Sequence, residues 1–172
     1  MSVDELDEME FEELPSTDIE VLTHVHFGMA GSFPLRLAEL FFADDGLHIA
    51  EYAYITPLFG LGTRKHRRES WGMQAIYDHH GLDEVLLQAD SVTWLAYDAV
   101  ERVRVHDGGR LGRPKLTVST DEDSYAYRIH DEGGADELAA DIEACADAHG
   151  FTVETVSGVG FSPVENVRRF LP

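Results

Sequence analysis

Apolar and polar residues alternate over residues 19–27 (IEVLTHVHF), and this period of two predicts a β-strand. The alternation predicts two faces, one formed by Val21, Thr23, Val25 and Phe27 and the other by Leu22, His24 and His26. The next residues, GMAGS (28–32), predict a loop. Two further strand-like runs, 34–43 and 46–54, flank Asp44-Asp45-Gly46, and an acidic pair before glycine in this position predicts a hairpin.

A helical pattern replaces the strand pattern over residues 57–89. Pro57, Gly60 and Gly62 interrupt the strands, and apolar residues then recur at helical spacing over residues 65–80. Gly81 is placed to end this helix, and residues 82–89 predict another short one. Because the segment follows the third strand, we expect a helical insertion that projects from the sheet.

Strand patterns return in the second half of the chain, at residues 91–96, 100–106, 113–120 and 124–130. An amphipathic helix follows over residues 135–149, with Leu138, Ile142, Cys145 and His149 on one stripe and Gly150 at its end. Residues 151–157 are a candidate for a further strand. The pattern predicts a mainly β protein with helices, in which a bent antiparallel sheet of seven strands precedes a closing helix.

Two segments resemble the pleckstrin-homology-like (PH-like) superfamily, including its GRAM and bacterial PH branches. They are the hairpin LAELFFADDGLHIAEY (37–52) and the strand–turn–strand unit SVTWLAYDAVERVRV (91–105). With the closing helix, the resemblance covers roughly residues 20–150 and implies a partly open barrel capped by that helix. We therefore expect an acidic disordered tail at 1–18, a PH-like domain at 19–157 with the insertion 57–89, and an extension at 158–172.

The charge of the chain is unusual, because 33 acidic residues face 13 basic ones, for a formal net charge of −20. This composition resembles that of cytosolic haloarchaeal proteins. At molar salt the Debye length is about 3 Å, so repulsion between carboxylates is mostly screened. The chain has no apolar stretch long enough for a transmembrane segment, and its acidic N-terminus does not resemble a signal peptide. We expect a halophilic, cytoplasmic protein without a specific nucleic-acid partner.

A basic run within the predicted insertion contrasts with this acidity. Arg64, Lys65, Arg67 and Arg68 supply four of the 13 basic residues within five positions, and Trp71 follows them. Insertions on a rigid scaffold commonly carry binding residues, so we predict these five residues as the binding site. The alternative is that the cations pair with carboxylates of the same chain, such as Glu69, Asp78 or those of the N-terminal tail.

Evidence for catalysis or a cofactor is sparse. The chain has no nucleophile elbow, phosphate-binding loop or dinucleotide fingerprint, and Cys145, the only cysteine, is interpreted as a packing residue. We predict no catalytic residue, no cofactor and no metal. His24 and His26, on alternate positions of one strand, are the candidate ligands if a metal does bind.

These observations favour a non-enzymatic interaction or adaptor module that binds a protein partner or a second copy of itself. Two alternatives remain open. One is the binding of an anionic ligand or a membrane surface through residues 64–68. The other is a small metal-dependent enzyme that uses His24 and His26.

Overall fold

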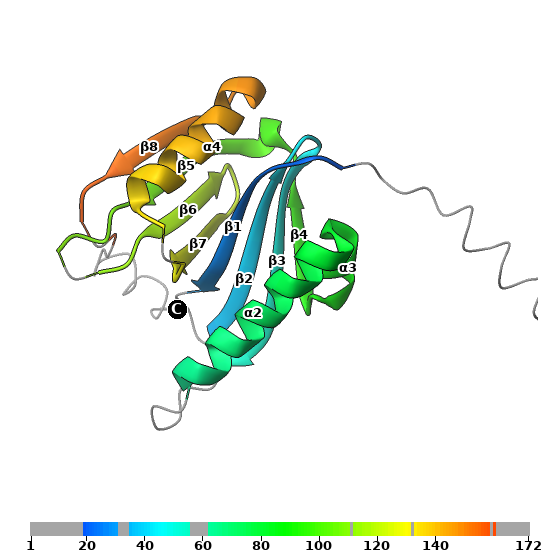
Figure 1. Cartoon of the computed structure of the whole chain (residues 1–172). Helices are drawn as coiled ribbons and strands as arrows, with labels where there is room; N and C mark the ends of the chain where they lie inside the picture. Colours follow the sequence, from blue (N-terminus) through cyan, green and yellow to red (C-terminus); the bar gives the residue numbers. More distant parts are fainter. Residues whose placement is uncertain are drawn as a thin grey trace, which may run out of the picture.

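A computed structural model describes residues 19–30, 35–55, 62–110, 112–131, 133–158 and 160. The described residues form one sheet and three α-helices (Figure 1). The strands are β1 (Val21–Ala30), β2 (Leu35–Ala43), β3 (Gly46–Ile55), β4 (Ser91–Leu95), β5 (Val100–His106), β6 (Lys115–Thr120), β7 (Ser124–Ile129) and β8 (Thr152–Val156). The helices are α2 (Gly62–His80), α3 (Leu82–Gln88) and α4 (Ala135–His149), with a 3₁₀ turn, η1 (Tyr97–Ala99), before β5. The predicted tail 1–18 and most of the extension 158–172 lie outside the described residues.

The sheet contains eight strands in the order β4-β3-β2-β1-β7-β6-β5-β8. All neighbouring strands are antiparallel except β5 and β8, which are parallel and are joined through β6, β7 and α4. The prediction of a mainly β protein with helices is confirmed. The prediction of seven antiparallel strands is corrected, because residues 152–156 form an eighth strand and make the sheet mixed. The edge strands β4 and β8 do not pair with each other, so the sheet is not closed.

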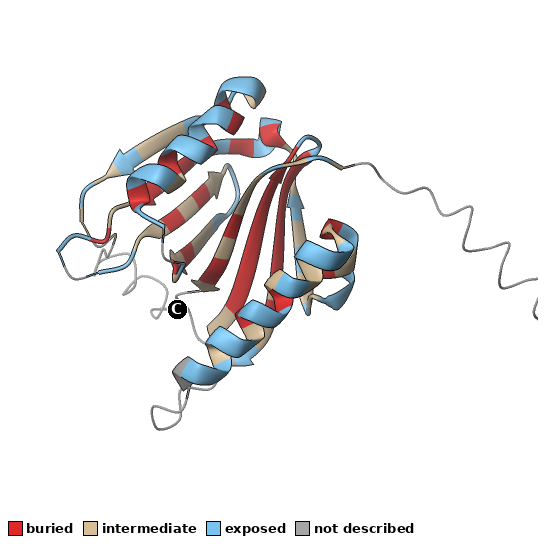
Figure 2. Ribbon diagram, viewed as in Figure 1, coloured by how far each residue is buried: buried red, intermediate tan, exposed pale blue. Residues whose placement is uncertain are grey.

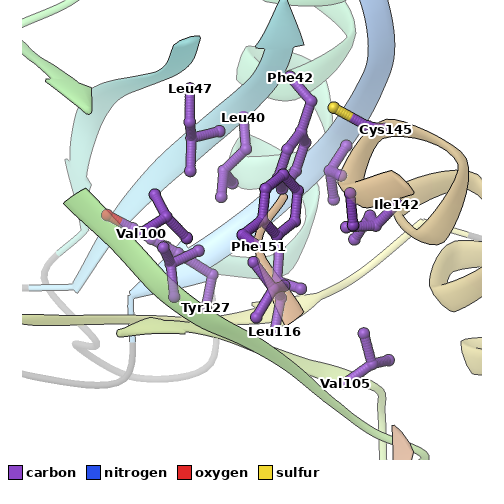
Figure 3. Close-up of a cluster of buried hydrophobic side chains, with 14 of the residues drawn as sticks. Leu40, Phe42, Leu47, Val100, Val105, Leu116, Tyr127, Ile142, Cys145 and Phe151 are labelled. Carbon is purple, nitrogen blue, oxygen red and sulfur yellow. The ribbon is translucent and has the colours of Figure 1, made fainter. Parts of the chain in front are cut away.

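The larger hydrophobic core joins the two halves of the bent sheet. Leu40, Phe42 and Leu47 from the β2–β3 hairpin pack with Leu116 on β6 and with other residues of strands β5–β7 (Figure 3). α4 adds Ala135, Ala139, Ile142, Cys145 and Ala146 to this core, and Leu138 packs against it. Gly150 ends α4 in the left-handed conformation, at φ 83° and ψ 16°, as its position predicts.

A second core covers the opposite face of β1–β3. Leu37 and Phe41 point into this core, whereas the intervening Ala38 and Leu40 belong to the first one, so β2 is buried on both faces. α2 and α3 cover the second core with Met73, Leu82 and Val85. The helices at 65–80 and 82–89 are thus confirmed, but the insertion lies along the sheet rather than projecting from it (Figure 2). In the described part of the chain, no helix combines the length and apolar content needed to cross a bilayer.

Two irregularities interrupt the strands beside this second core. β1 shifts register between Val25 and Gly28, where Phe27 has a φ of 54°, and β3 carries an extra residue at Ala53, where φ is 51°. Phe27 therefore packs in the second core, not on the face of Val25 as the alternation predicted. Val21 also changes face at another shift. The loop predicted from residue 28 is wrong for residues 28–30, which extend β1, whereas residues 31–32 lie outside the described residues.

Candidate functional site

Glu39 lies in the middle of β2, with its side chain only 1% exposed in the second core. It stands between Leu37 and Phe41, which are fully buried, so apolar side chains flank it along its own strand. A carboxylate removed from water in this way is strongly unfavourable unless hydrogen bonds and opposite charge compensate it. The surrounding side chains provide that compensation.

Four polar side chains from three other elements complete the network around Glu39, and we call these five residues the Glu39 cluster. His24 Nε2 and His26 Nδ1 lie 2.8 Å and 2.9 Å from Glu39 Oε2. The hydroxyl of Tyr52, on β3, donates to Oε1 at 2.5 Å. Ser70, fully buried on α2, completes the network through a hydrogen bond of 3.0 Å between its Oγ and His26 Nε2.

The two strand irregularities place these side chains. The register pairs Val25 with Leu40 and Gly28 with Ala38, so two residues of β1, His26 and Phe27, oppose the single residue Glu39. Such a bulge redirects the side chains beside it. The extra residue in β3, Ala53, directly follows Tyr52, which supplies the other hydrogen bond to Glu39. Among the residues that the structure describes, the two non-glycine residues with positive φ thus adjoin members of the cluster.

The network shifts the pKa values of Glu39, His26 and Tyr52. Burial alone raises the pKa of a carboxyl, but hydrogen bonds from His24 and His26 outweigh it and hold the pKa of Glu39 below its ordinary value. Burial alone lowers the pKa of an imidazole, yet the hydrogen bond to Glu39 and its charge raise the pKa of His26. Burial and the neighbouring carboxylate raise the pKa of Tyr52, so its hydroxyl stays protonated and donates.

His24, His26 and Glu39 also have the donor set of a metal site. One ligand atom from each lies within 4.8 Å of the others. The sequence singled out the two histidines but missed Glu39, Tyr52 and Ser70. One signal was available for Glu39, because it is the only charged residue in the apolar run LAELFFA (37–43). Two buried faces of one strand leave no solvated position for such a charge.

The basic residues predicted as a binding site lie on the opposite face of α2. We call Arg64, Lys65, Arg67, Arg68 and Trp71 the α2 basic face. All five are exposed, Trp71 to 64%. Among the described residues, none of the four cations forms an ion pair with a carboxylate, including Glu69 and Asp78. All but Lys65 line an open hollow of about 420 Å³.

Other arginines of the sheet do have carboxylate partners. Arg102 and Arg104, on β5, lie 3.3 Å and 3.2 Å from the carboxylate of Glu154 on β8. Arg36 pairs with Glu51 at 2.5 Å, and Glu51 also accepts from the hydroxyl of Tyr127. The cations of the α2 basic face differ from these arginines, because none of them has a carboxylate partner among the described residues.

Comparisons with known proteins give little further information. No family model matches the chain, and no curated protein matches it. Among solved structures, the hSac2 domain from the human phosphoinositide phosphatase Sac2 is similar with a TM-score of 0.49 and 12% sequence identity, over 95% of this chain and 93% of that one. A similarity of this size carries no argument about function.

Proposed function

We propose that this protein is an interaction module that binds an acidic segment of a protein partner through the α2 basic face. The observation that carries the proposal is that four neighbouring cations have no carboxylate partner among the described residues, in a chain with a net charge of −20. Among the described residues these cations form no ion pair with Glu69 or Asp78, whereas the N-terminal tail, the other partner considered for the basic run, lies outside them. An external acidic group would supply the missing partner.

The position of the cations in α2 strengthens this argument. The first turn of α2 contains no acidic residue and holds Arg64 and Lys65. Cations at a helix N-terminus oppose the helix dipole by about 0.3–1 kcal/mol each at low salt, and a bound anion reverses the sign of this effect. A carboxylate placed there gains both the side-chain charges and the free backbone N–H groups.

The shape and composition of the surface favour a protein segment over a compact ligand. Residues 64 to 71 extend over about 10 Å of helix, and the hollow that they border is open, not enclosing. Arginine and tryptophan are the residue types most enriched among those that dominate protein–protein binding energy. Trp71 offers an apolar contact beside arginines that can hold carboxylates with paired hydrogen bonds.

The scaffold that presents this face is consistent with a PH-like module, and we propose that assignment as well. The β2–β3 hairpin, the β4–η1–β5 unit and the helix after β7 occur in the order that the resemblance implies. β8 and the two helices of the insertion are additions to that arrangement. A cytoplasmic, salt-adapted host remains part of the proposal and depends on composition alone.

The test is binding of a labelled peptide of alternating glutamate and leucine, followed by fluorescence anisotropy at low and at molar KCl. Changing Arg64, Lys65, Arg67 and Arg68 together to Gln is expected to weaken binding at least about tenfold, which corresponds to about 1.4 kcal/mol. The matched control changes Arg102, Arg104, Arg110 and Arg113 to Gln, which removes the same charge elsewhere. That control is expected to bind within about twofold of wild type, since loss of exposed ion pairs has little effect.

Equal weakening in both quadruple variants would contradict the proposal, because binding would then follow net charge alone. Binding to vesicles containing anionic lipid but not to the peptide would favour a membrane surface instead. A variant lacking residues 1–18 distinguishes a further case. If this variant binds the peptide more tightly than wild type, the acidic tail competes for the α2 basic face. A difference in oligomeric mass between wild type and the variant with Gln at positions 64, 65, 67 and 68 would show that a second copy of the chain is the partner.

A further inference from the structure

We infer that His24, His26 and Glu39 form a binding site for one divalent transition-metal ion, with Zn²⁺ as the ion that best fits the donor set. The site lies beneath α2, on the opposite side of the helix from the α2 basic face. It is therefore independent of the proposed function and can exist whether or not an acidic partner binds.

The ligand geometry is the first argument. His24 and His26 occupy alternate positions of β1, and both imidazoles direct a ring nitrogen at the same carboxylate oxygen, at 2.8 Å and 2.9 Å. Zinc bonds of about 2.0–2.1 Å in tetrahedral geometry separate neighbouring ligand atoms by roughly 3.3 Å. The three ligand atoms lie within 4.8 Å of one another, and the two distances to Oε2 would each lengthen by roughly half an ångström when the ion enters between them. Two imidazoles and one carboxylate suit Zn²⁺ and other first-row divalent ions.

The groups behind the ligands are the second argument. A metal-ligating histidine usually hydrogen-bonds through its other ring nitrogen, which fixes its tautomer and orientation. His26 does so, because its Nδ1 faces Glu39 while its Nε2 lies 3.0 Å from Ser70 Oγ. On metal binding, the ring proton of His26 moves from Nδ1 to Nε2, where Ser70 Oγ accepts it. Tyr52 donates to Oε1 of Glu39, which leaves Oε2 for the ion.

Charge and burial are the third argument. As metal ligands both imidazoles are neutral, so the three ligand groups together carry a net charge of −1. Glu39 is 1% exposed and the two histidine side chains are 13% and 14% exposed, and a divalent cation would supply the compensation that the hydrogen-bonded histidines supply in its absence. The strain at Phe27, with a φ of 54° beside His26, fits a site whose geometry the surrounding structure imposes.

Three protein ligands leave a fourth position for water or another small ligand, which is the arrangement of catalytic rather than structural zinc sites. A hollow of about 450 Å³ is lined in part by Tyr77 and Asp78. The ring of Tyr77 also packs on His24, with ring centroids 4.7 Å apart. An exchangeable ligand would reach the ion past this ring.

The test is titration of the chelator-stripped full-length protein with Zn²⁺ by calorimetry, and with Co²⁺ by visible absorption. Wild type is expected to bind one Zn²⁺ and to give the absorption of four-coordinate Co²⁺. Glu39→Gln, which keeps the side-chain shape, is expected to weaken Zn²⁺ binding more than about 100-fold, since loss of an outer partner alone weakens it 10–100-fold. Ser70→Ala is expected to fall within that 10–100-fold range, an effect that a purely structural serine would not produce.

The matched control is the double change His79→Gln and His80→Gln, which removes an exposed histidine pair at the end of α2. It is expected to leave the single tight site intact. Loss of binding in this control, or no binding by wild type, would overturn the inference and make the Glu39 cluster a closed network that anchors α2. If Glu39→Gln does not fold in the absence of metal, His24→Gln replaces it as the deciding variant, and retained binding by that variant would also overturn the inference.

Discussion

Glu39 shows how one residue can organise a site. Its carboxylate accepts hydrogen bonds from both histidines of β1 and from Tyr52 of β3, and the network continues to Ser70 of α2. Each of these elements is therefore tied to the same buried group. Removing one partner of such a group typically destabilises a protein more than losing any exposed ion pair would. The position is under strong constraint even without a metal.

His130 provides a residue-scale prediction for pH. Burial lowers the pKa of its imidazole to about 4, and the charges of Arg113, Arg128 and His66 act in the same direction. The ordinary value in an unfolded chain is about 6.5, so the unfolded state binds the proton more tightly. The stability contributed by neutral His130 is present above that value and is lost as the pH falls towards 4.

His130→Gln should therefore lose less stability than wild type between pH 7 and pH 5. Urea unfolding of both proteins at the two pH values measures this difference, and other titrating groups cancel in the comparison. An equal or larger loss in the variant would show that His130 does not resist protonation in the folded protein.

At the scale of elements, the periodicity of apolar residues predicted most of the helices and strands. The β2–β3 hairpin at Asp44-Asp45, the helix with its Gly150 end and the paired helices of the insertion are all present. The prediction of which residues share a face of β1 was wrong around Phe27. A bulge there changes the side of the sheet on which a residue lies without changing the local pattern of residue types. The Glu39 cluster was missed for a related reason, since its members come from three strands and a helix that irregular register and tertiary packing bring together.

The irregularity in β3 predicts that replacing two of its alanines by glycine changes the stability of the protein in opposite directions. Ala53 has a φ of 51°, which costs a residue with a side chain about 1–2 kcal/mol and glycine little. Ala53→Gly should therefore stabilise the protein by roughly 0.5–1 kcal/mol after the greater backbone entropy of glycine is deducted. Ala50→Gly, in a regular and fully buried part of the same strand, should destabilise it by at least about 0.5 kcal/mol. Urea unfolding at neutral pH compares them, and destabilisation by both would show that Ala53 is not strained.

At the scale of the whole molecule, the packing of α2 against the sheet gives this helix two distinct sides. Ser70 and Met73 hold its inner side on the sheet, while the cations and Trp71 remain exposed on the outer side. Composition singled out the basic run but could not show that the helix packs along the sheet, because that depends on contacts between segments distant in sequence. The parallel pairing of β8 with β5 depends on the path of the chain through α4, so it could not be predicted from the sequence for the same reason. Salt adaptation was inferred from composition alone and stays a prediction.

The central claim is that an acidic protein segment binds on the outer side of α2. Hydrogen–deuterium exchange of the full chain, with and without the glutamate–leucine peptide, tests it most directly. The first N–H groups of a helix have no intrahelical acceptor, so they exchange readily until an external acceptor covers them. We predict slower exchange over residues 62–71 when the peptide is bound, and no change over residues 100–120, where Arg102 and Arg104 already pair with Glu154. Protection over residues 100–120 instead, or unchanged exchange over residues 62–71 at saturating peptide, would contradict the account.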